Sequence, residues 1–388
     1  GAGRPLVARR EYRVKIGITC YPTYGGSGAV ATELGLALAV RGHEVHFITY
    51  AQPFRLPAFS PRIVFHEVSI GQYPLFQYPP YDLALAVRMH EVATQQKLDL
   101  LHVHYAIPHA TSAWLAKQML LEAGVRLPVV TTLHGTDITI VGQDHSYHAI
   151  TKFSIEKSDH VTAVSHYLKD ETLRAFGCDN RRVEVIPNFV DPAVFDRARY
   201  DGALRLQLGN GRKVLMHISN FRPVKRVTDV VQIFAAVRRE IPSVLVMVGD
   251  GPERSAAEEE ARRLGVEADV RFLGKIDDVA PLLASADMYL LTTDRESFGL
   301  SALEAQACGV PVLGYDVGGL PEVVQSGVTG HLGVVGDVVG MARAAIDILG
   351  SDERWKAMSA AATHRASEHF ASDKVLPLYE SLYATAVR

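Results

Sequence analysis

The residues best suited to chemistry lie within one short segment, DRESFGLSALEA at positions 294–305. Glu296 is predicted in a loop after a strand, and Glu304, with seven residues between the two, lies two turns into the next predicted helix. Between them are three residues whose amides are expected at the N-terminus of that helix: Phe298, Gly299 and Leu300. Carboxylates accept hydrogen bonds from hydroxyls, and amides at a helix N-terminus bind phosphate. The segment therefore indicates a site for a nucleotide that carries a sugar, with two ordinary surface glutamates as the alternative.

A basic loop, HISNFRPVKR at positions 217–226, follows a predicted strand in the second half of the chain. Arg222 and Lys225 come directly before a predicted helix, where a bound phosphate would contact both side chains. The alternative is a solvated basic loop that binds nothing.

The first predicted turn is rich in glycine, with Gly25–Gly28 (GGSG) joining the first strand to the first helix. Glycines let backbone amides approach an anion at a helix N-terminus. A tight connection without a ligand explains the same residues equally well. A loose dinucleotide pattern also begins at Gly26, but the next strand, ending His46–Tyr50, offers no acidic residue for a ribose hydroxyl. That lack argues against NAD.

Several histidines lie at the ends of predicted strands. His102 and His104 share a strand face and His109 is nearby, so a metal site is conceivable. No paired cysteine or acidic ligand stands at a suitable spacing, which favours packed, hydrogen-bonded histidines and no metal. His134 differs, because it ends a central strand and is expected to point into a cleft.

The elements that must position these residues alternate between short β-branched runs and longer helical patterns. The first series of strands is predicted at Val14–Thr19, Val45–Tyr50, Leu100–His104, Val129–Leu133 and Val161–Val164. The second is predicted at Lys213–Ile218, Val244–Val248, Val270–Leu273, Met288–Leu291 and Val310–Leu313. Such alternation predicts two doubly wound α/β domains with parallel sheets. The alternation lapses over Pro187–Gly211, which places a domain boundary near residue 200.

Ligands of open parallel sheets bind beyond the carboxyl ends of the strands, so two facing sheets predict a deep cleft between domains. The motifs above all follow strands and should line that cleft. The last segment, Asp352–Val387, is predicted to be helical and to be kinked or divided at Pro377.

Composition narrows the class of protein. The 388 residues carry 40 Lys plus Arg against 43 Asp plus Glu, a net charge of −3, which argues against a nucleic-acid partner. Three widely spaced cysteines predict neither a disulfide framework nor a cysteine zinc site and favour a reducing cytosol. No run approaches the roughly 18 apolar residues of a membrane span, and the start has no signal-peptide stretch. A cytoplasmic protein without a membrane span is expected.

These motifs together resemble the GT-B glycosyltransferases, specifically the retaining family 4 type. The resemblance covers residues 12–388 and includes CYPTYGGSGAVATELG, LHVHYAIPHA, TTLHGTDIT, VIPNFVD and SNFRPVKRV besides ESFGLSALEA. It implies two Rossmann-like domains facing a cleft. Residues 12–200 would bind the acceptor, residues 201–371 would bind the nucleotide sugar, and a helix at 372–388 would pack back toward the first domain.

Within the family, the motifs are most similar to those of the bacillithiol-pathway members. The resemblance therefore implies transfer of N-acetylglucosamine (GlcNAc) from UDP-GlcNAc to the hydroxyl of L-malate, the first step of that pathway, with retention of configuration. It also implies no cofactor, no required metal and a homodimer, although nothing in the sequence pattern itself indicates a dimer.

The resemblance assigns the donor residues one by one. Lys225 and Arg222 would bind the diphosphate, and Asn220 stands where many family members have an arginine. Glu296 would hold hydroxyls of the transferred sugar, and Glu304 the ribose hydroxyls. The amides of Phe298, Gly299 and Leu300 would contact the sugar or the diphosphate.

The remaining assignments concern the first domain. His134 would contact the 6-hydroxyl of the sugar, and Gly26 and Ser27 would lie near the diphosphate and the acceptor. Further acceptor residues would be Tyr105 and Thr131, with Thr136 and Lys152 behind them.

Other functions stay open at this point. A related family 4 enzyme with an inositol phosphate or a polysaccharide as acceptor is the nearest, although a phosphorylated acceptor should need more cations than the loop around Tyr105 offers. A nucleotide-sugar-binding protein without catalysis and a nicotinamide dehydrogenase are the others.

Overall fold

The computed structural model describes residues 12–388 and contains two parallel sheets. The first sheet has the order β3-β2-β1-β4-β5-β6-β7. Its strands are β1 (Lys15–Thr19), β2 (Glu44–Thr49), β3 (Ile63–Glu67), β4 (Leu100–His104), β5 (Val129–Leu133), β6 (His160–Ala163) and β7 (Val183–Val185). The second sheet has the order β10-β9-β8-β11-β12-β13. Its strands are β8 (Lys213–Ile218), β9 (Ser243–Val248), β10 (Val270–Gly274), β11 (Met288–Leu291), β12 (Val312–Tyr315) and β13 (Gly330–Gly333).

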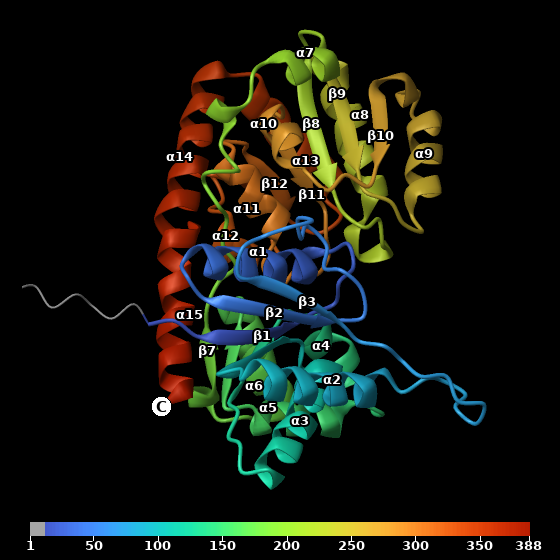
Figure 1. The fold of residues 1–388 in the computed structure, drawn as a ribbon. Coiled ribbons are helices and arrows are strands. Elements are labelled where there is room, and N and C mark those ends of the chain that lie inside the picture. The colour runs from blue at the N-terminus through green and yellow to red at the C-terminus, as the bar shows by residue number, and fades with distance from the viewer. Residues whose placement is uncertain (1–11) are drawn as a thin grey trace, which may run out of the picture.

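Helices cover both sheets, as the alternating pattern predicts. Those of the first domain are α1 (Gly26–Val40), α2 (Tyr81–Gln96), α3 (Thr111–Glu122), α4 (Thr136–Thr139), α5 (His148–Lys157) and α6 (His166–Phe176). Those of the second are α7 (Ala203–Gly209), α8 (Val227–Glu240), α9 (Arg254–Arg263), α10 (Ala280–Ala284), α11 (Leu300–Ala307), α12 (Leu320–Val323) and α13 (Val338–Leu349). The fold class predicted from the sequence, two Rossmann-like α/β domains, is confirmed (Figure 1).

Three strands were not predicted, and each is short or lies at a sheet edge. β3 and β7 are the two edges of the first sheet, and β13 is an edge of the second. β3 is only partly buried, β7 has three residues, and β13 reads GHLG. Edge strands lack the continuous apolar run of a strand buried on both faces, so the sequence pattern does not reveal them.

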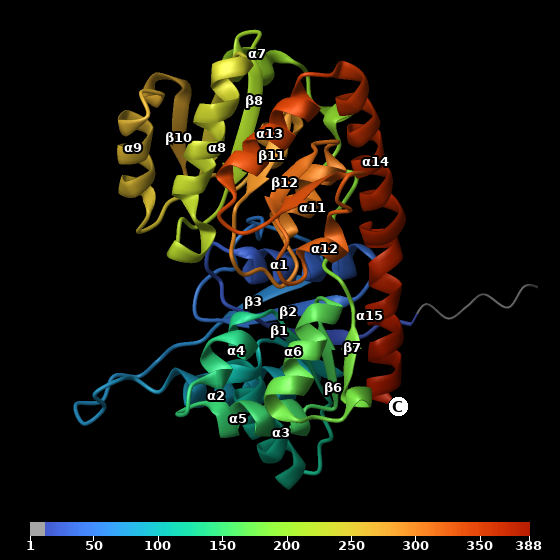
Figure 2. The ribbon, with the colours of Figure 1, turned by 180° about the vertical axis from the view of Figure 1, so that it is seen from behind.

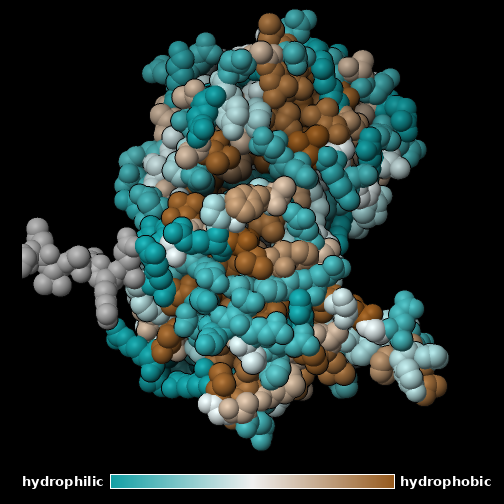
Figure 3. All heavy atoms as spheres, in the orientation of Figure 1, coloured by the Kyte–Doolittle hydropathy of each residue, from teal (hydrophilic) through white to brown (hydrophobic). Residues whose placement is uncertain are grey.

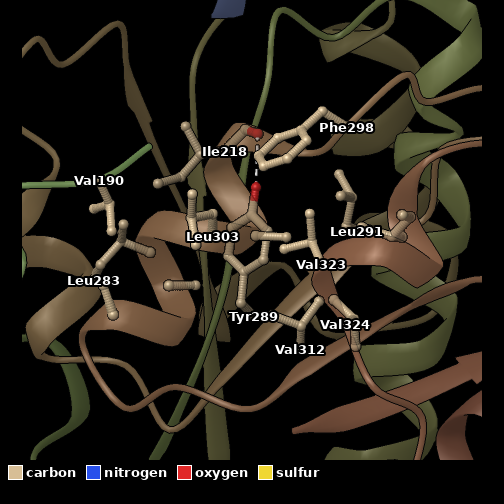
Figure 4. Close-up of a cluster of buried hydrophobic side chains, with 14 of the residues drawn as sticks. Val190, Ile218, Leu283, Tyr289, Leu291, Phe298, Leu303, Val312, Val323 and Val324 are labelled. Carbon is tan, nitrogen blue, oxygen red and sulfur yellow. Dashed lines mark hydrogen bonds between the residues drawn. The ribbon is translucent and has the colours of Figure 1, made fainter. Parts of the chain in front are cut away.

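A buried cluster in the second domain supports the loops that carry the candidate site. Tyr289 of β11 is fully buried, and its hydroxyl donates to the Ile218 carbonyl (3.0 Å), a bond drawn in Figure 4. The side chain of Phe298 lies in the same cluster (Figure 4), in edge contact with Phe370. The cluster therefore ties the end of β8 to the loop before α11.

The C-terminal segment forms two helices, α14 (Asp352–Phe370) and α15 (Ser372–Val387). The segment is divided, but at Ala371 and not at Pro377, which lies inside α15. Val190 donates to the Phe370 carbonyl (2.9 Å) and accepts from the Ser372 amide (3.0 Å). This short β-bridge holds Ala371 in an extended conformation and so ends α14.

The two C-terminal helices connect the domains. α14 lies along the second domain and α15 lies against the first, on the same side of the molecule (Figures 1 and 2). Tyr383 of α15 reaches the first sheet, where its hydroxyl lies 2.7 Å from His102 Nδ1. The chain passes between the sheets over residues 186–212, the region that contains the predicted boundary near residue 200. Within residues 12–388, no helix combines the length and apolar character needed to cross a bilayer.

Candidate active site

A cavity of about 190 Å³ lies between the two domains, where the surface is hollowed in Figure 3. The first domain contributes the turn before α1 and the segment between β2 and β3. The second contributes the loops after β8 and β11 and the start of α11. Six residues predicted to bind the donor line it: Gly26, Asn220, Lys225, Glu296, Leu300 and Glu304. Segments that are far apart in the sequence thus meet at one site.

Lys225 and Glu296 form an ion pair inside this cavity, with 3.2 Å between Nζ and Oε2. Lys225 ends a 3-10 turn that follows β8, and Glu296 follows β11. The two loops are joined by the Thr292 hydroxyl, which donates to the Lys225 carbonyl (2.9 Å). Since β8 and β11 are neighbours in the sheet, their carboxyl ends bring the two side chains together.

The start of α11 is shaped by Gly299, which has a left-handed backbone (φ +95°) at the N-cap. A Cβ there would lie 2.8 Å from Leu320 Cδ1, so a larger residue would also displace the end of that side chain. Because Phe298 points into the core, Phe298 and Gly299 can offer only backbone groups to a ligand.

Glu304 lies on α11 at the inner wall of the cavity. It is the fifth residue of the helix, so it stands one turn in rather than the two turns expected, because α11 begins at Leu300. Its side chain is 6% exposed, and Oε1 accepts from Arg55 Nη1 of the first domain at 2.9 Å. Arg55 was missed by the sequence analysis, since it stands alone in a loop with no motif around it.

Asn220 and Arg222 complete the basic loop. Asn220 Oδ1 is buried and has no hydrogen-bond partner, although the residue lines the cavity. Arg222 is exposed, and its charge acts on Tyr105 of the opposite domain, where it lowers the pKa of the phenol against the dominant effect of burial. Its charge therefore reaches the first domain, although Arg222 is not among the residues that line the cavity.

His134 is held by a network below the cleft. Its Nε2 lies 2.8 Å from His104 Nδ1. Asp137, which is 1% exposed, accepts from the amides of Ala106 (3.0 Å), Gly135 (3.0 Å) and His134 (3.3 Å). Burial lowers the pKa of His134 to about 3, so its imidazole is neutral. The residue can exchange hydrogen bonds with a ligand but brings no charge.

The three histidines closest to His134 in the sequence analysis, His102, His104 and His109, are buried and packed. His102 bonds Tyr383 and Thr132, and it stacks on His104 with 4.6 Å between ring centroids. His109 Nδ1 lies 2.5 Å from the His104 carbonyl. Among residues 12–388, no group of three or more His, Cys, Asp or Glu side chains could hold a metal ion.

Contacts between the domains surround the cleft. Both carboxylate oxygens of Glu322, on α12, accept from backbone amides at the start of α6, those of His166 (2.8 Å) and Tyr167 (3.0 Å). Gly135 faces Ser297 so closely that a Cβ would collide with its hydroxyl. The site is therefore enclosed by both halves of the molecule.

Comparison with known proteins identifies the family. Residues 24–194 match the family described as Glycosyltransferase Family 4, and residues 205–365 match Glycosyl transferases group 1. A Bacillus anthracis relative named N-acetyl-alpha-D-glucosaminyl L-malate synthase is 52% identical over 97% of this chain and 98% of the relative. The chain belongs to glycosyltransferase family 4. This confirms the resemblance and shows that the protein is an enzyme that transfers a glycosyl group.

Other relatives are more distant. A D-inositol 3-phosphate glycosyltransferase of Mycobacterium bovis is 30% identical over 88% of this chain and 75% of that protein. The solved structure of Anabaena HepE in complex with UDP and glucose has a TM-score of 0.78 at 20% identity, covering 96% of this chain and all of that one. A sucrose-phosphate synthase from Thermosynechococcus elongatus has a TM-score of 0.77 at 21% identity, with coverage of 96% and 99%. This glycosyltransferase therefore has the GT-B fold that was predicted.

The acceptor residues predicted for this glycosyltransferase fall into two groups. Tyr105 lies at the cleft with Ser27 and Thr136 as hydrogen-bond partners, the Thr136 hydroxyl donating at 3.3 Å. Thr131 is instead fully buried within β5, where its hydroxyl lies 2.7 Å from that of Ser158. Lys152 lies on α5, with Nζ 3.9 Å from Glu156. Among the described residues, no side-chain hydrogen bond or ion pair joins Thr131 or Lys152 to Tyr105.

The buried histidines should make the stability of this glycosyltransferase depend on pH. Burial lowers the pKa to about 3 for His102 and about 4 for His109, against 6.5 for a free imidazole. Below pH 6.5 these histidines bind protons in the unfolded chain but stay neutral in the folded chain. The free energy of unfolding should therefore fall as pH decreases from 6.5 toward 4. Each such histidine contributes up to about 1.4 kcal/mol per pH unit.

Urea unfolding between pH 7 and 4.5 measures this slope. His102→Gln should flatten it, while His145→Gln, at an exposed position, should leave it unchanged. An equal slope in the His102 variant and the wild type would contradict the expectation.

Proposed function

We propose that this glycosyltransferase transfers GlcNAc from UDP-GlcNAc to the hydroxyl of L-malate, the first step of bacillithiol biosynthesis. The observation that carries the proposal is the 52% identity over 97% of the chain to the Bacillus anthracis enzyme of that name. Identity spread over the whole chain includes both the donor and the acceptor side of the cleft.

The donor would bind to the second domain. Lys225 and Arg222 would hold the diphosphate with Asn220, whose unpartnered amide oxygen lies at the cavity. Glu296 would accept hydroxyls of the transferred sugar, and Glu304 those of the ribose. The free amides at the start of α11, after Phe298 and Gly299, would add partial positive charge near the phosphates. Neutral His134 would exchange a hydrogen bond with the 6-hydroxyl of the sugar.

The acceptor would lie between the domains beside Tyr105, Ser27 and Thr136. L-malate carries two carboxylates, and the cleft offers two positive features for them. The charge of Arg222 acts on Tyr105 from the second domain, and Gly25 at the N-cap of α1 has no side chain to occupy the free amides of that helix. This arrangement supports a small diacid better than a long neutral chain.

The proposed reaction retains the α configuration by a front-face route. The malate oxygen bonds to the anomeric carbon, through an oxocarbenium-like state, as the bond from that carbon to the β-phosphate oxygen breaks. The hydroxyl proton passes to that departing oxygen, so no separate base is needed. Asp137, the carboxylate below His134, is buried and engaged by three amides, which supports a route without an enzymic nucleophile.

No metal has a role in this proposal, because Lys225, Arg222 and the helix N-termini supply the positive charge that the leaving diphosphate requires. The family resemblance supports a homodimer. Three free cysteines support a reducing cytosol as the location: Cys20, Cys178 and Cys308.

Release of UDP in the presence of different acceptors tests the proposal. The purified enzyme with UDP-GlcNAc should release UDP with L-malate, and not with D-malate, myo-inositol phosphate or an oligosaccharide. The rate should be equal in EDTA and in Mg²⁺. Turnover with inositol phosphate and not with L-malate would show that inositol phosphate is the acceptor. Tight UDP binding without turnover on any acceptor would indicate a binding protein.

A further inference from the structure

Arg55 is the one described residue that reaches the candidate ribose site from the opposite domain through a charged contact. It lies between β2 and β3, and its Nη1 is 2.9 Å from Glu304 Oε1 and 3.7 Å from Glu33 Oε1 on α1. Its side chain is 15% exposed. One guanidinium therefore stands between a carboxylate of each domain, at the wall of the cavity.

The local structure fixes this side chain. Arg55 has a left-handed backbone (φ +66°) and lines the cavity. Its guanidinium lies 5.5 Å from the centroid of the Phe54 ring, and Phe54 in turn packs edge-on against Tyr24 of the turn before α1. A cation held over an aromatic ring and between two carboxylates has few alternative positions.

The charges explain why an arginine is needed. Burial raises the pKa of Glu33, and Arg55 partly offsets this effect. Burial alone would lower the pKa of Arg55, but the negative charges of Glu304 and Glu33, together with Tyr24, offset burial and raise it. Glu304 is nearly buried, and burying a carboxylate costs free energy unless it is paired with a cation or strong donors. Arg55 supplies that partner.

Two hydrogen-bonding groups at this point remain available. Arg55 Nε is buried without a partner, although the residue lines the cavity. Glu304 uses Oε1 for Arg55, which leaves Oε2 for another donor. An ionised carboxylate accepts several hydrogen bonds, so the ion pair does not exhaust it.

We propose that Arg55 is a positioning residue for the ribose of the donor. By holding Oε1, it fixes Glu304 in the rotamer in which Oε2 accepts a ribose hydroxyl. Because Arg55 belongs to the first domain and Glu304 to the second, this recognition is complete only when the domains are together. The inference rests on the proposed function, in which Glu304 holds the ribose.

A cycle of protein and ligand changes tests it. Calorimetry would measure UDP, 2′-deoxy-UDP and 3′-deoxy-UDP binding to the wild type, Arg55→Ala and Arg55→Lys. Arg55→Ala should bind UDP about tenfold or more weakly. The deoxy analogue that lacks the hydroxyl held by Glu304 should bind the wild type and Arg55→Ala within about twofold of each other. Arg55→Lys keeps the charge and should lie between.

The matched control is Arg62→Ala, an exposed arginine in the same segment with a similar left-handed backbone (φ +62°), which should bind UDP like the wild type. Thermal melting shows whether each variant is folded, and Arg55→Gln replaces Arg55→Ala in the cycle if the alanine variant does not fold. Equal weakening of UDP and both deoxy analogues would overturn the inference, as would unchanged or tighter UDP binding.

Failure of the inference is distinguishable from failure of the proposed function. If the wild-type protein binds no UDP, the proposed function itself is wrong. If the wild type binds UDP but the effects of changing Arg55 and of removing the hydroxyl are additive, only the proposed role of Arg55 is wrong. Neither result depends on the identity of the acceptor.

Discussion

Lys225→Ala is expected to lower kcat by about 10²–10³-fold, or roughly 3–4 kcal/mol in the barrier, while the protein stays folded. The departing diphosphate gathers negative charge, and Lys225 lies at the cavity with its ammonium already held by Glu296 at 3.2 Å. Such a preorganised cation needs no rearrangement as the charge develops. Steady-state UDP release with saturating UDP-GlcNAc and malate measures the effect.

Two variants make the result for Lys225 interpretable. Lys225→Arg retains the charge in a different shape and should retain more activity than the alanine variant. Lys356→Ala removes a lysine from the exposed face of α14, and its rate should match that of the wild type. Near-normal turnover of Lys225→Ala would exclude this lysine from the mechanism.

Asp137→Ala should lower the free energy of unfolding by about 3 kcal/mol or more. The carboxylate accepts from the backbone amides of Ala106, His134 and Gly135, and each buried donor left unpaired costs about 1–3 kcal/mol. The same change releases the loop that holds His134, so turnover should also fall. Urea denaturation monitored by circular dichroism measures the stability.

Asp144→Ala is the matched control for Asp137. Asp144 is exposed and its side chain accepts from one amide, that of Ser146 at 2.8 Å, so its loss should cost less than about 1 kcal/mol. Similar losses in the two variants would show that the network around Asp137 does not stabilise the His134 loop.

The positions of several site residues follow from local sequence. Lys225 and Glu296 each come after a strand, and strands that are parallel neighbours end at one edge of the sheet. The regular order of strands and helices was enough to place these two side chains in one cleft. Their pairing at 3.2 Å depends in addition on β8 and β11 being neighbours, which the strand order of the structure shows.

Two other expectations depended on tertiary contacts that the sequence does not reveal. Thr131 lies two residues before the end of β5 and is fully buried, so its depth in the sheet separates it from the cleft. The break between α14 and α15 is the second case. Pro377 is the residue in this segment whose type disfavours a helix, but the helices separate at Ala371, where Val190, far away in the chain, bonds the backbone. A local sequence pattern cannot reveal a contact with a residue so far away in the chain.

The sequence by itself determined the two α/β domains, the family and the loops that carry Lys225, Glu296 and Glu304, because periodicity and strand-end motifs are local properties. Only the tertiary structure decided that Arg55 stands 2.9 Å from Glu304, a residue 249 positions away. That contact depends on how two separately folded domains meet. The relative position of two domains is set by surfaces drawn from many segments, and no short stretch of sequence encodes it.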